Sequence, residues 1–238
     1  MKLSNIQTFF VPAALFALFA TAVLCRPLLP IDETRYMTVA WEMWLRGDWF
    51  APLTVNFELY HHKPPMLFWM INASWSVLGV SRWAGLAPVF LMSLSFIYLA
   101  KQLGRKLYGD EVAAKIPFLM LGSVPFLVYS TMVMFDVALG VFVLLSLLSL
   151  LKYAESRHPA FIMALALAMG LGVLTKGPVA WLYIMFPILL APLWQETNKS
   201  WLFWYGGCVL ALILSCIPVL LWLVPVLKAS NPDFAATV

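Results

Sequence analysis

Acids and bases that could act on a substrate occur in four separate short stretches of the chain. In order, these stretches are Asp32-Glu33-Thr34-Arg35-Tyr36, His61-His62-Lys63, Asp136 and Lys176. A carboxylate can take up or orient the proton of an attacking hydroxyl or amine. Lysine and arginine can hold a phosphate and stabilise the charge that builds on it as it leaves. Together these groups suit transfer from a lipid phosphate, although a transporter could use the same residue types.

The composition indicates that the bilayer is the solvent for this chain. Of its 238 residues, 63% are hydrophobic and 11% are charged, and the mean hydropathy is +0.90. An ordinary soluble domain is roughly 45–50% apolar and about 25% charged. The net charge is only +4, and no basic run alternates with aromatics, so we expect no nucleic-acid partner. The three cysteines lack C-x-x-C spacing and predict neither a disulfide framework nor a zinc site.

The apolar runs and the positive charges together predict a topology with seven membrane spans. The predicted spans are 9–25, 83–103, 112–130, 133–151, 160–174, 178–194 and 201–227. Basic residues are expected on the cytoplasmic side. With seven spans, Lys2, Lys101–Lys115, Lys152–Arg157 and Lys199 all fall there. The sequence therefore predicts an all-α, polytopic membrane helix bundle with a cytoplasmic N-terminus.

Residues 26–82 are predicted to form the first outer loop, which carries two helices in the membrane interface. Counting 64–79 as a span would move Lys101–Lys115 outside, so we place it in the interface. The other helix is predicted to begin with Asp32 as N-cap and to end at Gly47. The 64–79 helix is predicted to open at Pro64-Pro65 and to end near Gly79. In this topology all four ionisable stretches lie on one outer face.

Each ionisable residue also has a plainer explanation. Asp32 could serve only as a helix cap, and Lys63 and Lys176 could extend to lipid headgroups. The two histidines could be exposed loop residues or metal contacts. Asp136 lies among apolar residues and needs a partner, for which Lys63 or Lys176 would serve.

Five motifs then occur in an order and at a spacing that resemble a known family. They are Pro30-Ile31-Asp32-Glu33-Thr34-Arg35-Tyr36, His62-Lys63-Pro64-Pro65, the basic turn Lys101–Gly109, Phe135-Asp136, and Leu174-Thr175-Lys176-Gly177-Pro178. This set resembles the bacterial aminoarabinose transferase and protein mannosyltransferase-like group of GT-C glycosyltransferases, and the resemblance covers nearly the whole chain.

The resemblance implies sugar transfer from a polyprenyl-phosphate donor at the periplasmic face of the bacterial inner membrane. The acidic pair, above all its first member Asp32 and then Glu33, is the implied catalytic site together with Asp136. Arg35, Lys63 and Lys176 are the implied contacts of the lipid phosphate, with Tyr36 in the same cavity. Lipid A, a protein or a glycan would be the acceptor, and membrane lipids would surround the site.

Two departures from the family pattern leave alternatives open. The residue before Lys63 is often Glu in the family, where it binds a metal, and here it is His62, so a divalent metal remains an open expectation. Family members are also about twice as long, so residues 1–238 are expected to form one module that stops before further site residues. A lipid-phosphate-binding subunit without turnover and a small transporter are the competing hypotheses.

Overall fold

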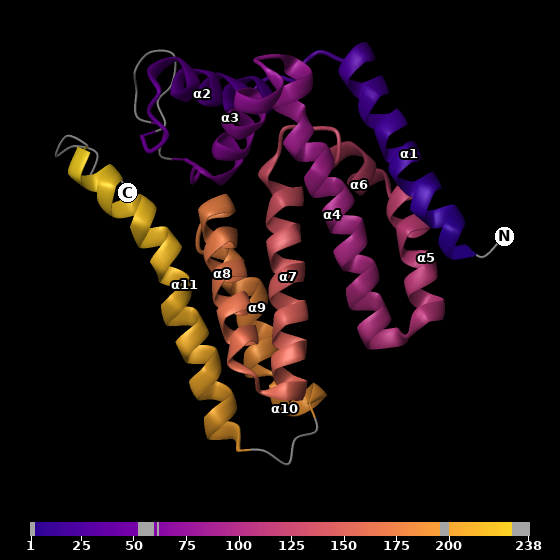
Figure 1. Cartoon of the computed structure of the whole chain (residues 1–238), viewed down its shortest axis with the longest axis vertical. Helices are drawn as coiled ribbons and strands as arrows, with labels where there is room; N and C mark the ends of the chain where they lie inside the picture. The colour runs from indigo at the N-terminus through magenta and orange to yellow at the C-terminus, as the bar shows by residue number, and fades with distance from the viewer. Residues whose placement is uncertain (1–2, 52–59, 61, 196–199, 230–238) are drawn as a thin grey trace. The chain divides into compact units, whose positions relative to one another are not determined.

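The computed structural model describes residues 3–51, 60, 62–195 and 200–229 (Figure 1). These residues form helices and no strand. The helices are α1 (Leu3–Cys25), α2 (Asp32–Arg46), α3 (Met66–Leu78), α4 (Arg82–Tyr108), α5 (Asp110–Leu121), α6 (Val124–Tyr129), α7 (Phe135–Ser156), α8 (Pro159–Lys176), α9 (Val179–Leu189), α10 (Ala191–Trp194) and α11 (Trp201–Ala229). The predicted all-α membrane bundle is confirmed.

Four helices are long and apolar enough to cross a membrane: α4, α7, α8 and α11. The other three predicted spans stay predictions. The apolar part of α1, Phe9–Cys25, is shorter than this length criterion. The predicted run 112–130 is divided into α5 and α6, and 178–194 into α9 and α10. A proline stands in the first turn after each break, where its missing backbone N–H costs no helical hydrogen bond.

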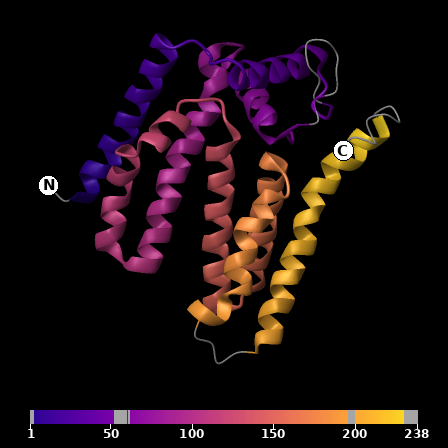
Figure 2. The ribbon, with the colours of Figure 1, turned by 180° about the vertical axis from the view of Figure 1, so that it is seen from behind.

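The helices form two compact units, which we describe one at a time. Unit 1 contains residues 1–61 and 65–141, and unit 2 contains 62–64 and 142–238. In unit 1, α4 packs against α1, α3 and α5. Both ribbon views show α2 and α3 beside the end of α4 where that helix begins (Figures 1 and 2). In unit 2, α8 lies along α11 and also packs against α9.

Sequence signals set the ends of the helices that carry the ionisable stretches. Gly47 ends α2 with a left-handed backbone (φ 65°), and its N–H bonds to the carbonyl of Trp44. Pro65 precedes α3 and Gly79 follows it, as predicted. The predicted N-cap at Asp32 is wrong: Ile31 occupies that position in a helical conformation, so Asp32 is already the first helical residue.

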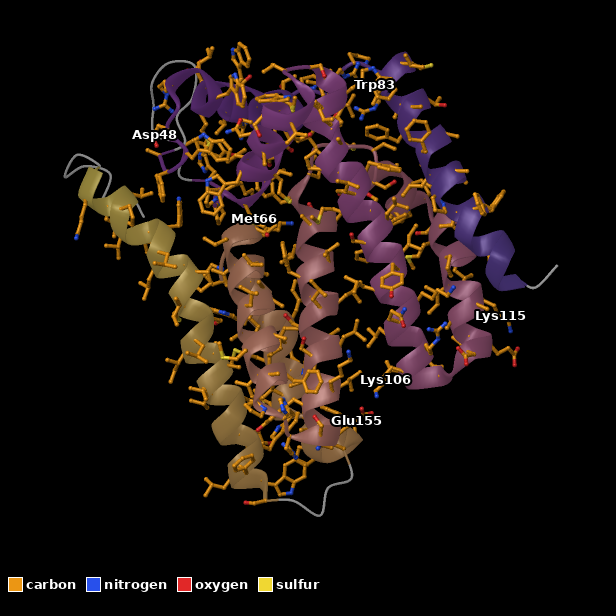
Figure 3. The ribbon with its side chains drawn as sticks, in the orientation of Figure 1. Asp48, Met66, Trp83, Lys106, Lys115 and Glu155 are labelled. Carbon is orange, nitrogen blue, oxygen red and sulfur yellow. The ribbon has the colours of Figure 1, made fainter. Side chains whose placement is uncertain are left out.

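The acidic first turn of α2 and the basic turn after α4 lie at different ends of unit 1. Arg82 at the start of α4 bonds to the carbonyls of Val23 and Arg26, which places the end of α1 there. Figure 3 shows Trp83 and Lys106 near opposite ends of α4. At 1.5 Å per residue the 27-residue helix is roughly 40 Å long. The two charged regions are therefore separated by more than the thickness of a hydrocarbon core.

Candidate functional site

Glu33 is a buried carboxylate that joins three parts of unit 1. Its side chain is fully buried and forms an ion pair with Arg26. Its Oε2 accepts from the backbone N–H of Leu29 at 2.8 Å, and its Oε1 accepts from that of Val133 at 2.9 Å. A buried charge is tolerated only when it is paired and hydrogen-bonded in this way. Glu33 therefore fixes the first turn of α2 against the segment that leads into α7.

Arg26 strengthens the same connection from the other side. Besides Glu33, its Nη2 donates to the carbonyl of Thr131 at 2.9 Å. The five residues Arg26, Leu29, Glu33, Thr131 and Val133 form a set that we call the Glu33 lock. Because it joins residues about 100 positions apart, the lock sets where α2 and α7 begin relative to each other.

Asp32 and Arg35 lie on the exposed side of the same turn of α2, and Tyr36 is buried between this turn and α7. The Tyr36 hydroxyl donates to Asp32 Oδ1 at 3.3 Å. Its ring meets the ring of Phe135 edge to face, with centroids 4.9 Å apart. Phe135 is the residue before Asp136, so the aromatic pair connects the two exposed acids through one buried contact.

Burial also fixes the protonation state of Tyr36. Loss of solvent, with smaller contributions from Tyr60 and Asp32, raises the pKa of Tyr36 to about 12, against a lowering by Arg35. Burial likewise raises the pKa of Tyr60, while the charge of Arg35 and a hydrogen bond with Arg35 oppose this change. At neutral pH both phenols therefore keep their protons, and Tyr36 can donate to Asp32.

Asp136 occupies the first turn of α7 and is exposed. Its neighbours Phe135 and Val137 are buried at 1% and 6% exposure. Phe135 packs on Phe68 as well as Tyr36, and Phe68 packs on Tyr60. These four rings form a buried aromatic group beneath the exposed groups of Asp32, Arg35 and Asp136. Asp32 hydrogen-bonds with Tyr36 and Arg35 with Tyr60, and Asp136 follows Phe135 in the chain, so all three charged residues adjoin this aromatic group.

The structure brings together only some of the predicted site residues. Asp32, Glu33, Arg35, Tyr36 and Asp136 all belong to unit 1, whereas His62, Lys63 and Lys176 belong to unit 2. Lys176 is the last residue of α8, before Gly177. The convergence of the two lysines with the acids, and their pairing with Asp136, stay predictions. His61 lies outside the described residues.

The described residues do not supply a metal ligand set for His62. Among them, no three His, Cys, Asp or Glu side chains come together in a group that could hold a metal ion. A divalent metal at His62 stays a prediction.

Sequence reasoning missed Arg26, Arg82, Tyr60 and the backbone at 131–133. A signal for the two arginines was present. Both lie in the predicted outer region, where an excess of positive charge is not expected. Each arginine is explained by local acceptors: Arg26 by Glu33, and Arg82 by carbonyls at the end of α1. The other partners carry no sequence signal, because they are a buried ring and backbone groups.

Comparison with known proteins places these residues in context. A family model described as dolichyl-phosphate-mannose-protein mannosyltransferase matches residues 62–222. An "Undecaprenyl phosphate-alpha-4-amino-4-deoxy-L-arabinose arabinosyl transferase" of Pseudomonas aeruginosa (strain UCBPP-PA14) is 33% identical over 91% of this chain and 40% of its own length. A transferase of the same name, numbered 2, from Proteus mirabilis (strain HI4320) is 31% identical over 95% of this chain and 40% of its own length.

Two crystal structures of ArnT from Cupriavidus metallidurans share the fold. The apo structure has a TM-score of 0.78 at 22% identity, covering 98% of this chain and 44% of that one. The structure bound to undecaprenyl phosphate has a TM-score of 0.78 at 24% identity, covering 95% and 42%. The chain thus spans about two fifths of the length of the proteins that it matches.

Proposed function

Because the chain belongs to the dolichyl-phosphate-mannose-protein mannosyltransferase family, we propose that it carries part of the active site of a membrane glycosyltransferase. The enzyme moves a sugar from a polyprenyl-phosphate donor to a hydroxyl or amine acceptor. Lipid A, a protein and a glycan are the acceptor classes. The arabinosyl transferase names of the relatives support a pentose as the sugar.

The observation that carries this proposal is the arrangement of Asp32, Arg35 and Asp136 around Tyr36 and Phe135. The acceptor oxygen or nitrogen attacks the anomeric carbon of the sugar, and the bond from that carbon to the phosphate oxygen breaks. Asp32 takes the acceptor's proton. The polyprenyl phosphate leaves with one more negative charge, which Arg35 stabilises. Asp136 orients the acceptor.

Tyr36 and the Glu33 lock act on this site by positioning. The Tyr36 hydroxyl orients the Asp32 carboxylate through its 3.3 Å hydrogen bond. The lock holds the start of α2 against the segment before α7, so Asp32 and Asp136 keep a fixed relation. A fixed relation between reacting groups supplies much of the rate enhancement in transfers of this kind. Lys63 and Lys176 are proposed as further ligands of the lipid phosphate.

We place this site at the outer face of the bacterial inner membrane, with the N-terminus in the cytoplasm. The support is the distribution of charge along unit 1. Arg105 and Lys106 at the end of α4 and Lys115 in α5 flank the turn between these helices, and α2 lies beside the other end of α4 (Figure 1). Positive residues favour the cytoplasmic side.

The test is sugar transfer by the complete protein carrying Asp32→Asn. We expect turnover with a polyprenyl-phosphate sugar to fall about a hundredfold or more, because the amide cannot accept the proton. Asp110→Asn is the matched control, since that exposed carboxylate lies at the far end of α4 and pairs with Arg105. Wild-type turnover by a normally expressed Asp32→Asn variant would sink the proposal.

A non-catalytic subunit that binds a lipid phosphate is the second candidate, supported by the exposed side chain of Arg35, which suits phosphate binding with or without turnover. Binding of polyprenyl phosphate separates the two functions. If the protein is catalytic, Asp32→Asn lowers turnover but leaves binding of the lipid intact. Arg35→Ala weakens that binding. A subunit shows the Arg35→Ala effect on binding and no transfer activity even in the wild type.

A further inference from the structure

Unit 2 contains a cavity of about 690 Å³ between the end of α7, the start of α8 and the start of α11. Its volume lies within the range of roughly 300–1,000 Å³ that is typical of ligand pockets. Most of its lining is apolar, and it includes Ile162, Met163, Leu202, Phe203 and Leu210. Lys176 is at the other end of α8, roughly 27 Å away by helix length. The cavity is thus separate from the proposed transfer site.

Two neighbouring glycines open this cavity along α11. A Cβ on Gly207 would lie 2.1 Å from the Tyr153 hydroxyl, so Gly207 allows α7 and α11 to approach closely. A Cβ on Gly206 would meet no atom within 4 Å. Gly206 also lines the cavity, so the space beside it is room that no side chain of the described residues fills.

One cation is fixed in the wall of the cavity. The guanidinium of Arg157 lies 4.7 Å from the ring centre of Trp204 and 5.2 Å from that of Tyr153. These two rings stack on each other with centroids 5.5 Å apart. Their faces attract the cation and hold its plane in one orientation. Arg157, which also hydrogen-bonds with Tyr153, therefore places a guanidinium of fixed orientation in the cavity wall, and arginine is a residue type that recognises phosphate.

We propose that this cavity binds an anionic phospholipid of the bilayer, with one acyl chain along Gly206 and the phosphate at Arg157. Charge complementarity supports this occupant. Lys152 lies at the same end of α7, over the ring of Phe161 at 5.6 Å, and Glu155 is the one acid of this turn (Figure 3). The predicted topology puts this end on the cytoplasmic side, where basic pockets between spans bind anionic lipids.

The apolar surroundings also favour a bilayer lipid over a soluble ligand. Leu202, Phe203 and Met163 line the cavity and are 84%, 64% and 58% exposed. In a span such as α11 these side chains face hydrocarbon, so the acyl chains of the bilayer have direct access. Inorganic phosphate could bind to Arg157 but would bury no apolar surface of the cavity.

The test compares phosphatidylglycerol with phosphatidylcholine of the same acyl chains, added to the complete purified protein in detergent. We expect native mass spectrometry and thermal shift to show tighter binding of phosphatidylglycerol. Arg157→Ala should weaken that binding about tenfold. Gly206→Leu should do the same by filling the space, without lowering the melting temperature of the lipid-free protein.

Matched controls separate this site from others. Val209→Phe adds bulk to an exposed position of α11 outside the cavity and should leave phosphatidylglycerol binding unchanged. Gly206→Leu should leave binding of polyprenyl phosphate unchanged. Failure of the phospholipid proposal would therefore not contradict the proposed transfer site. Equal binding of the two phospholipids, or unchanged phosphatidylglycerol binding by Gly206→Leu, overturns the proposal. A lower melting temperature of lipid-free Gly206→Leu also overturns it, because a protein segment then occupies the cavity.

Discussion

Asp32 and Glu33 are adjacent acids, and the first turn of α2 directs one into solvent and the other into the protein. Only Asp32 is exposed where a substrate could reach it. Glu33 accepts from Arg26 and from two backbone N–H groups, so its oxygens are already engaged. We therefore propose Asp32 as the base and Glu33 as a positioning residue. The catalytic roles of both acids stay predictions.

Tyr36 gives a pH-dependent prediction. Its pKa is raised from 10 to about 12, chiefly by burial. Between these values the folded protein keeps a proton that the unfolded chain loses, so stability falls as pH rises through this window. Below pH 10 the contribution of the protonated Tyr36 to stability is fully present. An alkaline titration followed by tyrosinate absorbance should show late ionisation of the buried tyrosines, and Tyr36→Phe should lower the amplitude of this late phase by one tyrosine.

The control for this titration is Tyr108→Phe, which changes a tyrosine that is 71% exposed and should leave the late phase in place. Loss of that phase in the control, or ionisation of Tyr36 near pH 10, would contradict the burial argument. Tyr36→Phe should also reduce turnover, since the phenyl ring keeps the contact with Phe135 but cannot donate to Asp32.

At the scale of elements, the Glu33 lock predicts that the conservative substitution Glu33→Gln lowers both stability and turnover. Glu33→Gln removes the charge that pairs with Arg26 and turns an amide N–H₂ toward a backbone N–H. We expect a loss of about 3 kcal/mol in stability, as for a broken buried ion pair, together with reduced turnover. Equilibrium unfolding in mixed detergent and the transfer assay would measure both effects.

A pH profile distinguishes positioning from catalysis at this residue. Residual turnover of Glu33→Gln should keep the pH dependence of the wild type, because Asp32 remains the base. The matched control is Glu111→Gln, which removes an 85% exposed partner of Lys115 and should change neither stability nor turnover. A Glu33→Gln variant as stable as the wild type would refute the lock.

Which elements could be predicted depends on how local their signals are. Gly47, Pro65 and Gly79 mark helix ends through their own backbone preferences, so the end of α2 and both ends of α3 are predicted correctly, whereas the start of α2 is not. The break between α5 and α6 falls within a continuously apolar run, so the hydropathy of the sequence does not mark it. The contact between Glu33 and Val133 involves a backbone group about 100 residues away, which no periodicity can reveal.

At the scale of the whole molecule, the seven-span topology is the prediction to test. Four spans meet the length and hydropathy of a membrane helix. Val80 lies two residues before the start of α4, and Glu111 lies three residues after its end, in the first turn of α5. In a variant whose three native cysteines are replaced by alanine, Val80→Cys should react with an impermeant thiol reagent from outside. Glu111→Cys should react only after the membrane is opened. Labelling of both from the same side would refute the topology.

The Glu33 lock also has a consequence for how the protein is made. The Glu33 carboxylate accepts a hydrogen bond from the backbone N–H of Val133, which lies 100 residues further along the chain. At about 5–20 residues per second, Val133 leaves the ribosome some 5–20 s after Glu33. During that interval α1 and α2 are already synthesised, while the carboxylate still lacks one of its donors. The first turn of α2 therefore completes its hydrogen bonds only after residue 133 has been translated.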